Sequence, residues 1–144
     1  MLCYNYAMWA VYALLSALFA GMTSILIKTG IQNVNSNLGT ALRTVVVLIM
    51  AWTIVFVSGR QNEIANIEAK SLLFLGLSGI ATGLSWLCFN KALQLGEASK
   101  VISVDKFSVV VGIVLAFIVL KETITIKAVI GGLLITIGTL VLIF

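Results

Sequence analysis

The sequence predicts an all-α membrane protein, a bundle of five transmembrane helices, and three observations support this prediction. Of the 144 residues, 61% are hydrophobic and 10% are charged, whereas soluble domains have about 45–50% apolar and about 25% charged residues. The apolar residues gather into five runs of about twenty residues, the length that a helix needs to cross the hydrocarbon core. The connections between these runs are short and polar, so no extramembrane domain is expected.

We expect one transmembrane domain over residues 1–144. The runs are too long for barrel strands and lack their alternation of polar and apolar residues. Local signals support the expected ends, because Asn35 and Ser99 are suited to cap helix N-termini and Gly30 and Gly59 lie where helices should stop. The sequence has no Pro, so no kink of that origin is expected. The predicted helices cover residues 7–27, 38–58, 71–89, 101–120 and 126–144.

Two charged residues fall inside predicted helices, at a similar depth from the same side of the membrane. Arg43 lies about 8 Å along the second helix and Asp105 about 6 Å along the fourth, and both helices begin on that side. An unpaired Arg or Asp at the centre of a membrane helix costs about 2.5–3.5 kcal/mol, and less towards the interface. We therefore predict that Arg43 and Asp105 meet, directly or through water, at the mouth of an internal cavity.

Three more polar or aromatic residues lie near this predicted mouth. Trp86 and Asn90 stand at the same end of the third helix, where Trp86 is either a member of an aromatic belt or a flat wall for an organic ligand. Lys106 is about 100° around the helix from Asp105, so it faces a partner chain or extends to the headgroups. A purely structural alternative is that Arg43 and Lys106 only extend to the headgroups.

Several function classes are disfavoured by composition. The chain has no His, and Cys3 and Cys88 are too few and too widely separated for a disulfide framework or a zinc site. No catalytic motif is present, so we expect no enzyme activity, no metal and no cofactor. The net charge of +4 is small and dispersed, which argues against nucleic acid as a partner.

Small residues form ridges on several predicted helices. Gly79 and Gly83 make a GxxxG pattern in the third helix, and Gly132 with Thr136 thins one face of the fifth. In lipid, such ridges allow close approach of two helix backbones. We expect them to serve either packing within one bundle or a dimer seam, for which the fifth helix is the better candidate.

The basic residues give almost no orientation signal. Five Lys and Arg fall on the side where the second and fourth helices begin and four on the other side, although the positive-inside rule needs an imbalance. An odd number of helices also places the two termini on opposite sides. Either the chain inserts both ways and forms an antiparallel homodimer, or a partner fixes its orientation. In both cases we expect one half of an inverted-repeat, ten-helix assembly.

The second half of the chain also resembles a known family. It reads Gly-Leu-Ser-Trp-Leu-Cys-Phe-Asn-Lys-Ala-Leu over 83–93 and Leu-Gly-Glu-Ala-Ser-Lys-Val over 95–101, and it continues to a Leu-Lys-Glu at 120–122 and a glycine-containing last helix. These features are similar to a single EamA-type domain of the drug/metabolite transporter superfamily. Two departures are Ser103, where many members have a Pro that breaks the fourth helix, and Lys121, where Gly is usual.

The resemblance implies a multipass protein of a prokaryotic inner (cell) membrane that exports or exchanges small organic metabolites or drugs by alternating access. Most relatives carry two such domains, so a one-domain chain is expected to work as a pair. Related four-helix multidrug transporters have a glutamate in the first helix, and residues 7–27 contain no acid. An alternative function is a non-transporting scaffold or accessory subunit, in which the intramembrane charges only hold helices together.

Overall fold

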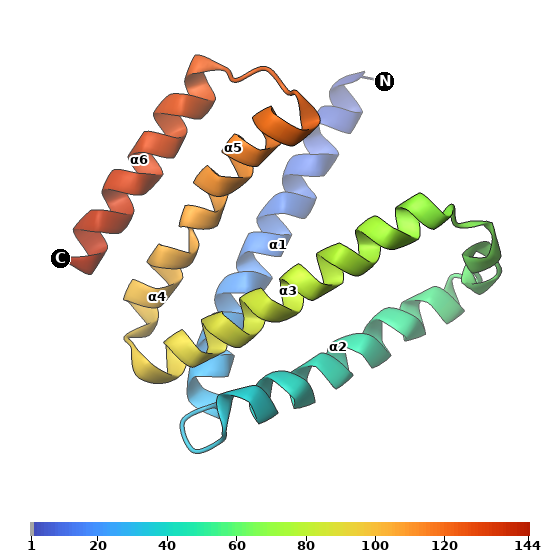
Figure 1. Cartoon of the computed structure of the whole chain (residues 1–144), viewed down its shortest axis with the longest axis horizontal. Coiled ribbons are helices and arrows are strands. Elements are labelled where there is room, and N and C mark those ends of the chain that lie inside the picture. Colours follow the sequence, from blue (N-terminus) through green and yellow to red (C-terminus); the bar gives the residue numbers. More distant parts are fainter. Residues whose placement is uncertain (1) are drawn as a thin grey trace. The chain divides into compact units, whose positions relative to one another are not determined.

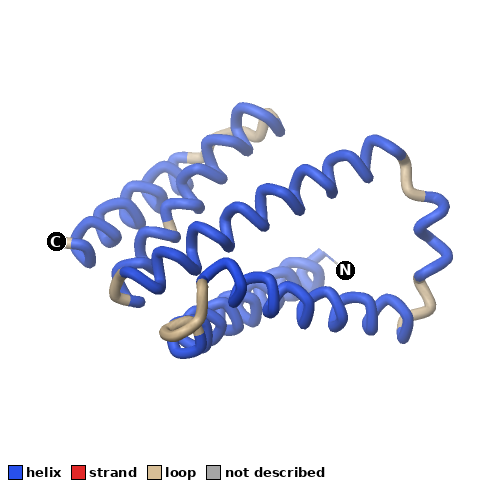
Figure 2. Tube along the Cα trace, turned by 60° about the horizontal axis from the view of Figure 1, so that its bottom comes forward, coloured by secondary structure: helices blue, strands red, loops and turns tan. Residues whose placement is uncertain are grey.

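The computed structural model describes residues 2–144, and over that range the chain is built from helices joined by short connections, with no strand (Figure 1 and Figure 2). The elements are α1 (Leu2–Gly30), α2 (Ser36–Val57), the 3₁₀ helix η1 (Gln61–Asn66), α3 (Ala69–Leu95), α4 (Ala98–Asp105), α5 (Phe107–Leu120) and α6 (Ile126–Ile143).

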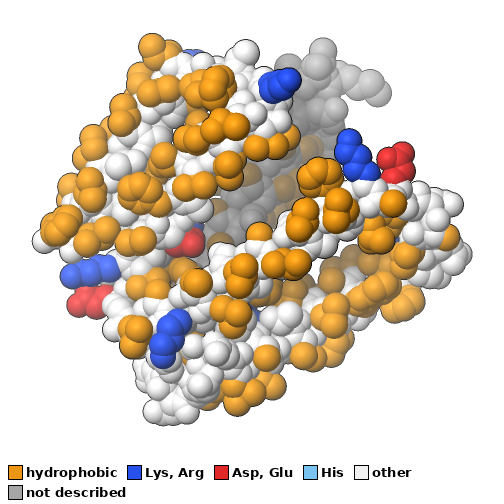
Figure 3. Space-filling view, viewed as in Figure 1, with side chains coloured by type: hydrophobic (Ala, Val, Ile, Leu, Met, Phe, Trp, Pro, Cys, Tyr) orange, Lys and Arg blue, Asp and Glu red, His pale blue; other side chains and the backbone are white. Residues whose placement is uncertain are grey.

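Five stretches are long and apolar enough to cross a membrane, as the sequence predicted. Among the described residues, large apolar side chains are mostly exposed, and they cover much of the face drawn in Figure 3. Two of the described hydrophobic residues are buried, Ile31 and Leu93. The buried polar residues are more numerous: Ser24, Ser36, Thr40, Asn90 and Thr139. This distribution fits helices surrounded by lipid and joined by a few polar contacts.

Capping side chains mark the starts of two helices, α2 and α6. The Asn35 side chain accepts from the backbone N–H groups of Asn37 (2.9 Å) and Leu38 (3.4 Å), which confirms its predicted capping role. Thr125 caps α6 in the same way, accepting from the N–H of Ala128. The prediction for Ser99 was wrong, because α4 begins one residue before it and the residue at the cap position is Glu97, with no side-chain capping bond.

The expected single helix over 101–120 is divided in the structure. The α-helical pattern is interrupted at Lys106, whose N–H donates to the carbonyl of Ser103 three residues back, at 3.1 Å. That carbonyl also accepts from Thr139 of α6, at 3.1 Å. The Ser103 carbonyl thus accepts both from its own chain and from a hydroxyl of the neighbouring helix, and bonds of the second kind help interrupted helices to be tolerated within lipid.

The described chain consists of two compact units. Unit 1 comprises Met1–Leu26 and Leu95–Phe144, and unit 2 comprises Ile27–Gln94. In unit 1, α6 packs against both α4 and α5. In unit 2, α2 and α3 face each other through contacts near the start of α2 and the end of α3.

Candidate functional site

The contact between α2 and α3 in unit 2 is made by a buried polar pair. Asn90 Nδ2 donates to Thr40 Oγ1 at 2.7 Å, and the two residues are 1% and 5% exposed. Thr40 Oγ1 in turn donates to the carbonyl of Ser36, also at 2.7 Å. Because α3 continues past the predicted end at residue 89 to Leu95, Asn90 lies inside the helix rather than in a connection.

Arg43 lies next to this pair, three residues further along α2. Its guanidinium carbon stands 4.4 Å from the centre of the Trp86 ring, one helical turn before Asn90 on α3. A cation over an indole face is attracted by the ring quadrupole, and the attraction grows when water is excluded. The Nη1 atom of Arg43 and the Oδ1 atom of Asn90 are both buried without a hydrogen-bond partner.

We call the contact between α2 and α3 that Thr40, Asn90, Arg43 and Trp86 form the seam. Beyond Asn90, at the end of α3, two side chains bind backbone carbonyls. Lys28 Nζ donates to the carbonyl of Leu93 at 2.6 Å. Gln94 Nε2 donates to the carbonyls of Ile31 (3.1 Å) and Val34 (2.9 Å), in the turn between α1 and α2. These bonds fix the turn against the end of α3 around the fully buried Leu93, and they give the seam a rigid frame.

In unit 1, Asp105 and Lys106 are adjacent at the interruption between α4 and α5, and both are exposed. The interruption lies against α6 through the bond from Thr139 to Ser103. Arg43 belongs to unit 2, where it makes no ion pair with a residue of 27–94. The meeting of Arg43 with Asp105 therefore stays a prediction.

The predicted packing residues have different surroundings. A Cβ atom added at Gly132 would touch Ile113 of α5 at 3.9 Å, so this glycine lies at a helix contact within unit 1. Thr136 donates to the carbonyl of Gly132 in its own helix. A Cβ atom added at Gly79 or Gly83 would meet nothing within 4 Å, so the GxxxG face of α3 is open within its unit.

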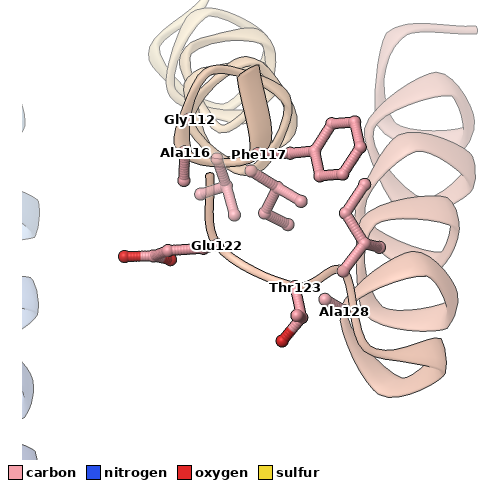
Figure 4. A pocket seen from close by; sticks show the side chains of 9 residues that line it. Gly112, Ala116, Phe117, Glu122, Thr123 and Ala128 are labelled. Atoms are coloured by element: carbon pink, nitrogen blue, oxygen red, sulfur yellow. The ribbon is translucent and has the colours of Figure 1, made fainter. Parts of the chain in front are cut away.

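A separate cavity of about 340 Å³ lies in unit 1 between α5, the connection over 121–125 and the start of α6 (Figure 4). Its lining is mostly apolar, and Glu122 is its charged residue. In Figure 4 the Glu122 carboxylate extends away from α6, whereas the Phe117 ring lies on the α6 side. No residue of the predicted path lines this cavity. Within residues 2–144, no three His, Cys, Asp or Glu residues are grouped to hold a metal ion.

The sequence identified three members of the seam, Arg43, Trp86 and Asn90, which the structure brings together. It missed Thr40 and Gln94. Thr40 lies three residues before Arg43, and helix residues at that spacing share a face, so this spacing was the available signal. The contacts of Gln94 could not be predicted because the predicted third helix ended at residue 89, before it.

A chain with five apolar spans and a buried, cationic polar seam between two of them has the features of a multipass membrane transporter. Comparison with known families supports this class and gives the family: the EamA-like transporter family matches residues 7–144, and the chain belongs to it.

One curated relative is an "uncharacterized transporter in cobO 3'region" from Sinorhizobium sp. It is 39% identical over 134 residues, which cover 93% of this chain and 95% of the relative. The relative is therefore also a chain of about this length. No solved structure matches the chain significantly.

Proposed function

We propose that this chain is one half of a transporter that exports or exchanges small organic molecules by alternating access, and that two copies work as an antiparallel pair in a prokaryotic inner membrane. The observation that carries the proposal is the state of Arg43. A guanidinium within a membrane span, stacked on Trp86 and with one nitrogen unpartnered, has a donor available for a ligand. Intramembrane ionisable groups of this kind mark substrate paths in many transporters.

The antiparallel pair is supported by two observations. The near-equal division of Lys and Arg, five against four, leaves orientation unbiased. The alignment with this one domain covers 95% of the relative's length, so the relative has room for only one such domain. A two-fold axis in the membrane plane would relate two copies as inverted repeats, with substrate held between them near the midplane.

The proposed substrate path includes residues of both units. Arg43, Trp86 and Asn90 form its wall in unit 2. Asp105 and Lys106 contribute from unit 1, where they lie at the interruption between α4 and α5. Transporter sites are commonly built at such interrupted helices, since backbone groups there are available to ligands.

Topology is tested by cysteine labelling from each side of the membrane. In a background with Cys3 and Cys88 replaced by Ser, we expect Asn33→Cys and Asn62→Cys each to be labelled partly from both sides. Labelling of each position from one side only would exclude dual insertion.

Transport is tested with purified protein, first by thermal stability across a panel of organic acids, amines, sugars and nucleobases, then by counterflow in liposomes. A ligand at a hundredfold excess over its Kd stabilises the protein by about 2.7 kcal/mol. We expect Arg43→Ala to abolish both stabilisation and counterflow of the same compound. If no panel compound stabilises the protein or exchanges across the liposome, the proposal is wrong.

A scaffold function is favoured by one observation, since the Arg43–Trp86 stack and the Thr40–Asn90 bond suffice to hold α2 against α3. The same experiments separate the two functions. A scaffold predicts that Arg43→Ala lowers stability in the absence of any ligand and that no solute crosses the liposome membrane.

A further inference from the structure

The α2–α3 seam contains two buried polar atoms of opposite hydrogen-bonding character, and neither has a partner. Arg43 Nη1 is a charged donor, and Asn90 Oδ1 is an acceptor. Each costs free energy when it is buried without a partner, and more so within lipid, where water is scarce. A molecule that offers an acceptor to the first and a donor to the second removes both costs together.

The orientation of the Asn90 amide is fixed by its neighbour. Thr40 has one hydroxyl proton, and it points to the carbonyl of Ser36, 2.7 Å away, because a carbonyl can only accept. Thr40 Oγ1 can then only accept from Asn90, so the amide must present Nδ2 to it. The oxygen of Asn90 is therefore left as a fixed acceptor that needs a donor from elsewhere.

The two unpartnered atoms belong to neighbouring turns of the seam. Thr40 and Arg43 are about 4.5 Å apart along α2, and Trp86 and Asn90 are about 6 Å apart along α3. The bonded pair is Thr40 with Asn90, and the stacked pair is Arg43 with Trp86. Both unpartnered atoms therefore belong to adjacent turns of one seam, so we take a single small ligand with two neighbouring polar groups to serve both.

The charged residues around the seam favour a ligand with a negatively charged group. In unit 2 the basic residues Lys28, Arg43 and Lys91 lie at the seam end of the helices. The acids of that unit, Glu63 and Glu68, lie at the opposite end of α2 and α3, and Glu63 is already paired with Arg60. A net positive region bounded by lipid attracts anions and disfavours organic cations.

We propose that this seam binds a small organic carboxylate with a hydrogen-bond donor on the neighbouring carbon, either the hydroxyl of a 2-hydroxy acid, which is an anion, or the ammonium group of a 2-amino acid, which is a zwitterion. The carboxylate accepts from Arg43 Nη1, and the neighbouring donor binds Asn90 Oδ1. The inference rests on the proposed transport function only in taking this carboxylate as the molecule that is moved.

Access requires α2 and α3 to part. Both atoms are enclosed by the protein, so a ligand reaches them only when the helices separate beside the Thr40–Asn90 bond. The frame formed by Lys28 and Gln94 holds the end of the seam during such an opening. Binding then couples directly to the opening of these two helices.

The experiment measures thermal stabilisation of the full-length protein in lipid nanodiscs by four probes of similar size: lactate, alanine, propionate and ethanolamine. Lactate and alanine distinguish a hydroxyl from an amino donor. We expect at least one of them to bind at least tenfold more tightly than propionate, which lacks the donor, and ethanolamine not to bind. Equal binding of lactate, alanine and propionate, tighter binding of ethanolamine, or no binding of any probe would overturn the inference.

Variants assign the preference to this seam. Asn90→Leu should bring the affinity of the preferred probe down to that of propionate, and Asn90→Asp should restore an acceptor, though with a negative charge that weakens anion binding. Arg43→Gln should abolish anion binding. Lys70→Gln, which removes an exposed charge at the opposite end of α3, is the matched control and should leave the order of the probes unchanged. If Asn90→Leu fails to fold, the order of affinities of the four probes for the unaltered protein still supports or overturns the inference.

The two proposals fail separately. Counterflow of another solute, with no preference for lactate or alanine in the binding assay, would overturn the inference and leave transport intact. Arg43-dependent binding of lactate or alanine without exchange of any solute across liposomes would support the inference and overturn transport.

Discussion

The hydrogen bond between Asn90 and Thr40 should contribute measurably to stability, and a double-mutant cycle with Thr40→Val and Asn90→Leu isolates its contribution. Bonds between membrane helices have coupling energies of about 0.6 kcal/mol on average and up to about 1.7 kcal/mol. This bond is short, at 2.7 Å, and both residues are at least 95% buried. Without it, the Asn90 amide has no partner at either atom, because Oδ1 is already unpartnered. We therefore expect a coupling of about 1–1.7 kcal/mol.

The assay is reversible unfolding in bicelles by steric trapping, with the four proteins of the cycle measured side by side. A coupling of 1.4 kcal/mol corresponds to about a tenfold change in the unfolding equilibrium constant. Thr53→Val is the matched control, because Thr53 donates to Ile49 in its own helix and is exposed. A coupling of Asn90 with Thr40 no larger than its coupling with Thr53 would refute the reasoning.

Three other substitutions test backbone and capping features by thermal unfolding. Lys121 has a left-handed conformation (φ 55°), so Lys121→Gly should stabilise the protein by about 0.5–1 kcal/mol, and no gain over Lys121→Ala would contradict this. Gly59 has φ 69°, so Gly59→Ala should cost about 1 kcal/mol, and a neutral effect would contradict the strain. Thr139→Val removes the donor to Ser103 and should destabilise by about 1 kcal/mol more than Thr136→Val; equal effects would contradict a role for the bond between helices.

The number and type of the spans could be predicted from sequence because they depend on local apolarity over about twenty residues. Asn35 could be identified as a cap for the same reason, since a cap acts on N–H groups two or three residues away. Lys121 is also instructive: the structure places a left-handed residue there, a conformation that suits the Gly expected at this position from the family resemblance.

The division of the fourth span could not be predicted from the sequence. With no Pro, residues 101–120 contain no residue that forces an interruption. The carbonyl of Ser103, next to the interruption, accepts from the hydroxyl of Thr139, which is 36 residues away in the chain. Pairings at this distance depend on how helices pack, and a single hydroxyl in an apolar run gives no sign of its partner.

The seam was predictable only in part. Arg43, Trp86 and Asn90 were selected because charged, aromatic and amide groups are unusual near the end of an apolar run. Their mutual contacts depend on the rotation of α2 and α3 about their axes, which the sequence pattern leaves open because apolar residues surround both helices.

The buried side chains of the described chain are mostly hydroxyls and amides, and the large apolar ones face outward. Assembly of these helices thus depends on a handful of directional bonds rather than on exclusion of water, which is absent in the hydrocarbon region. Short alcohols should therefore separate the helices of this protein more readily than urea does. Short alcohols, which compete for hydrogen bonds but preserve helices, should separate the helices while their circular dichroism remains helical. Urea, which weakens apolar burial in soluble proteins, should have little effect on it.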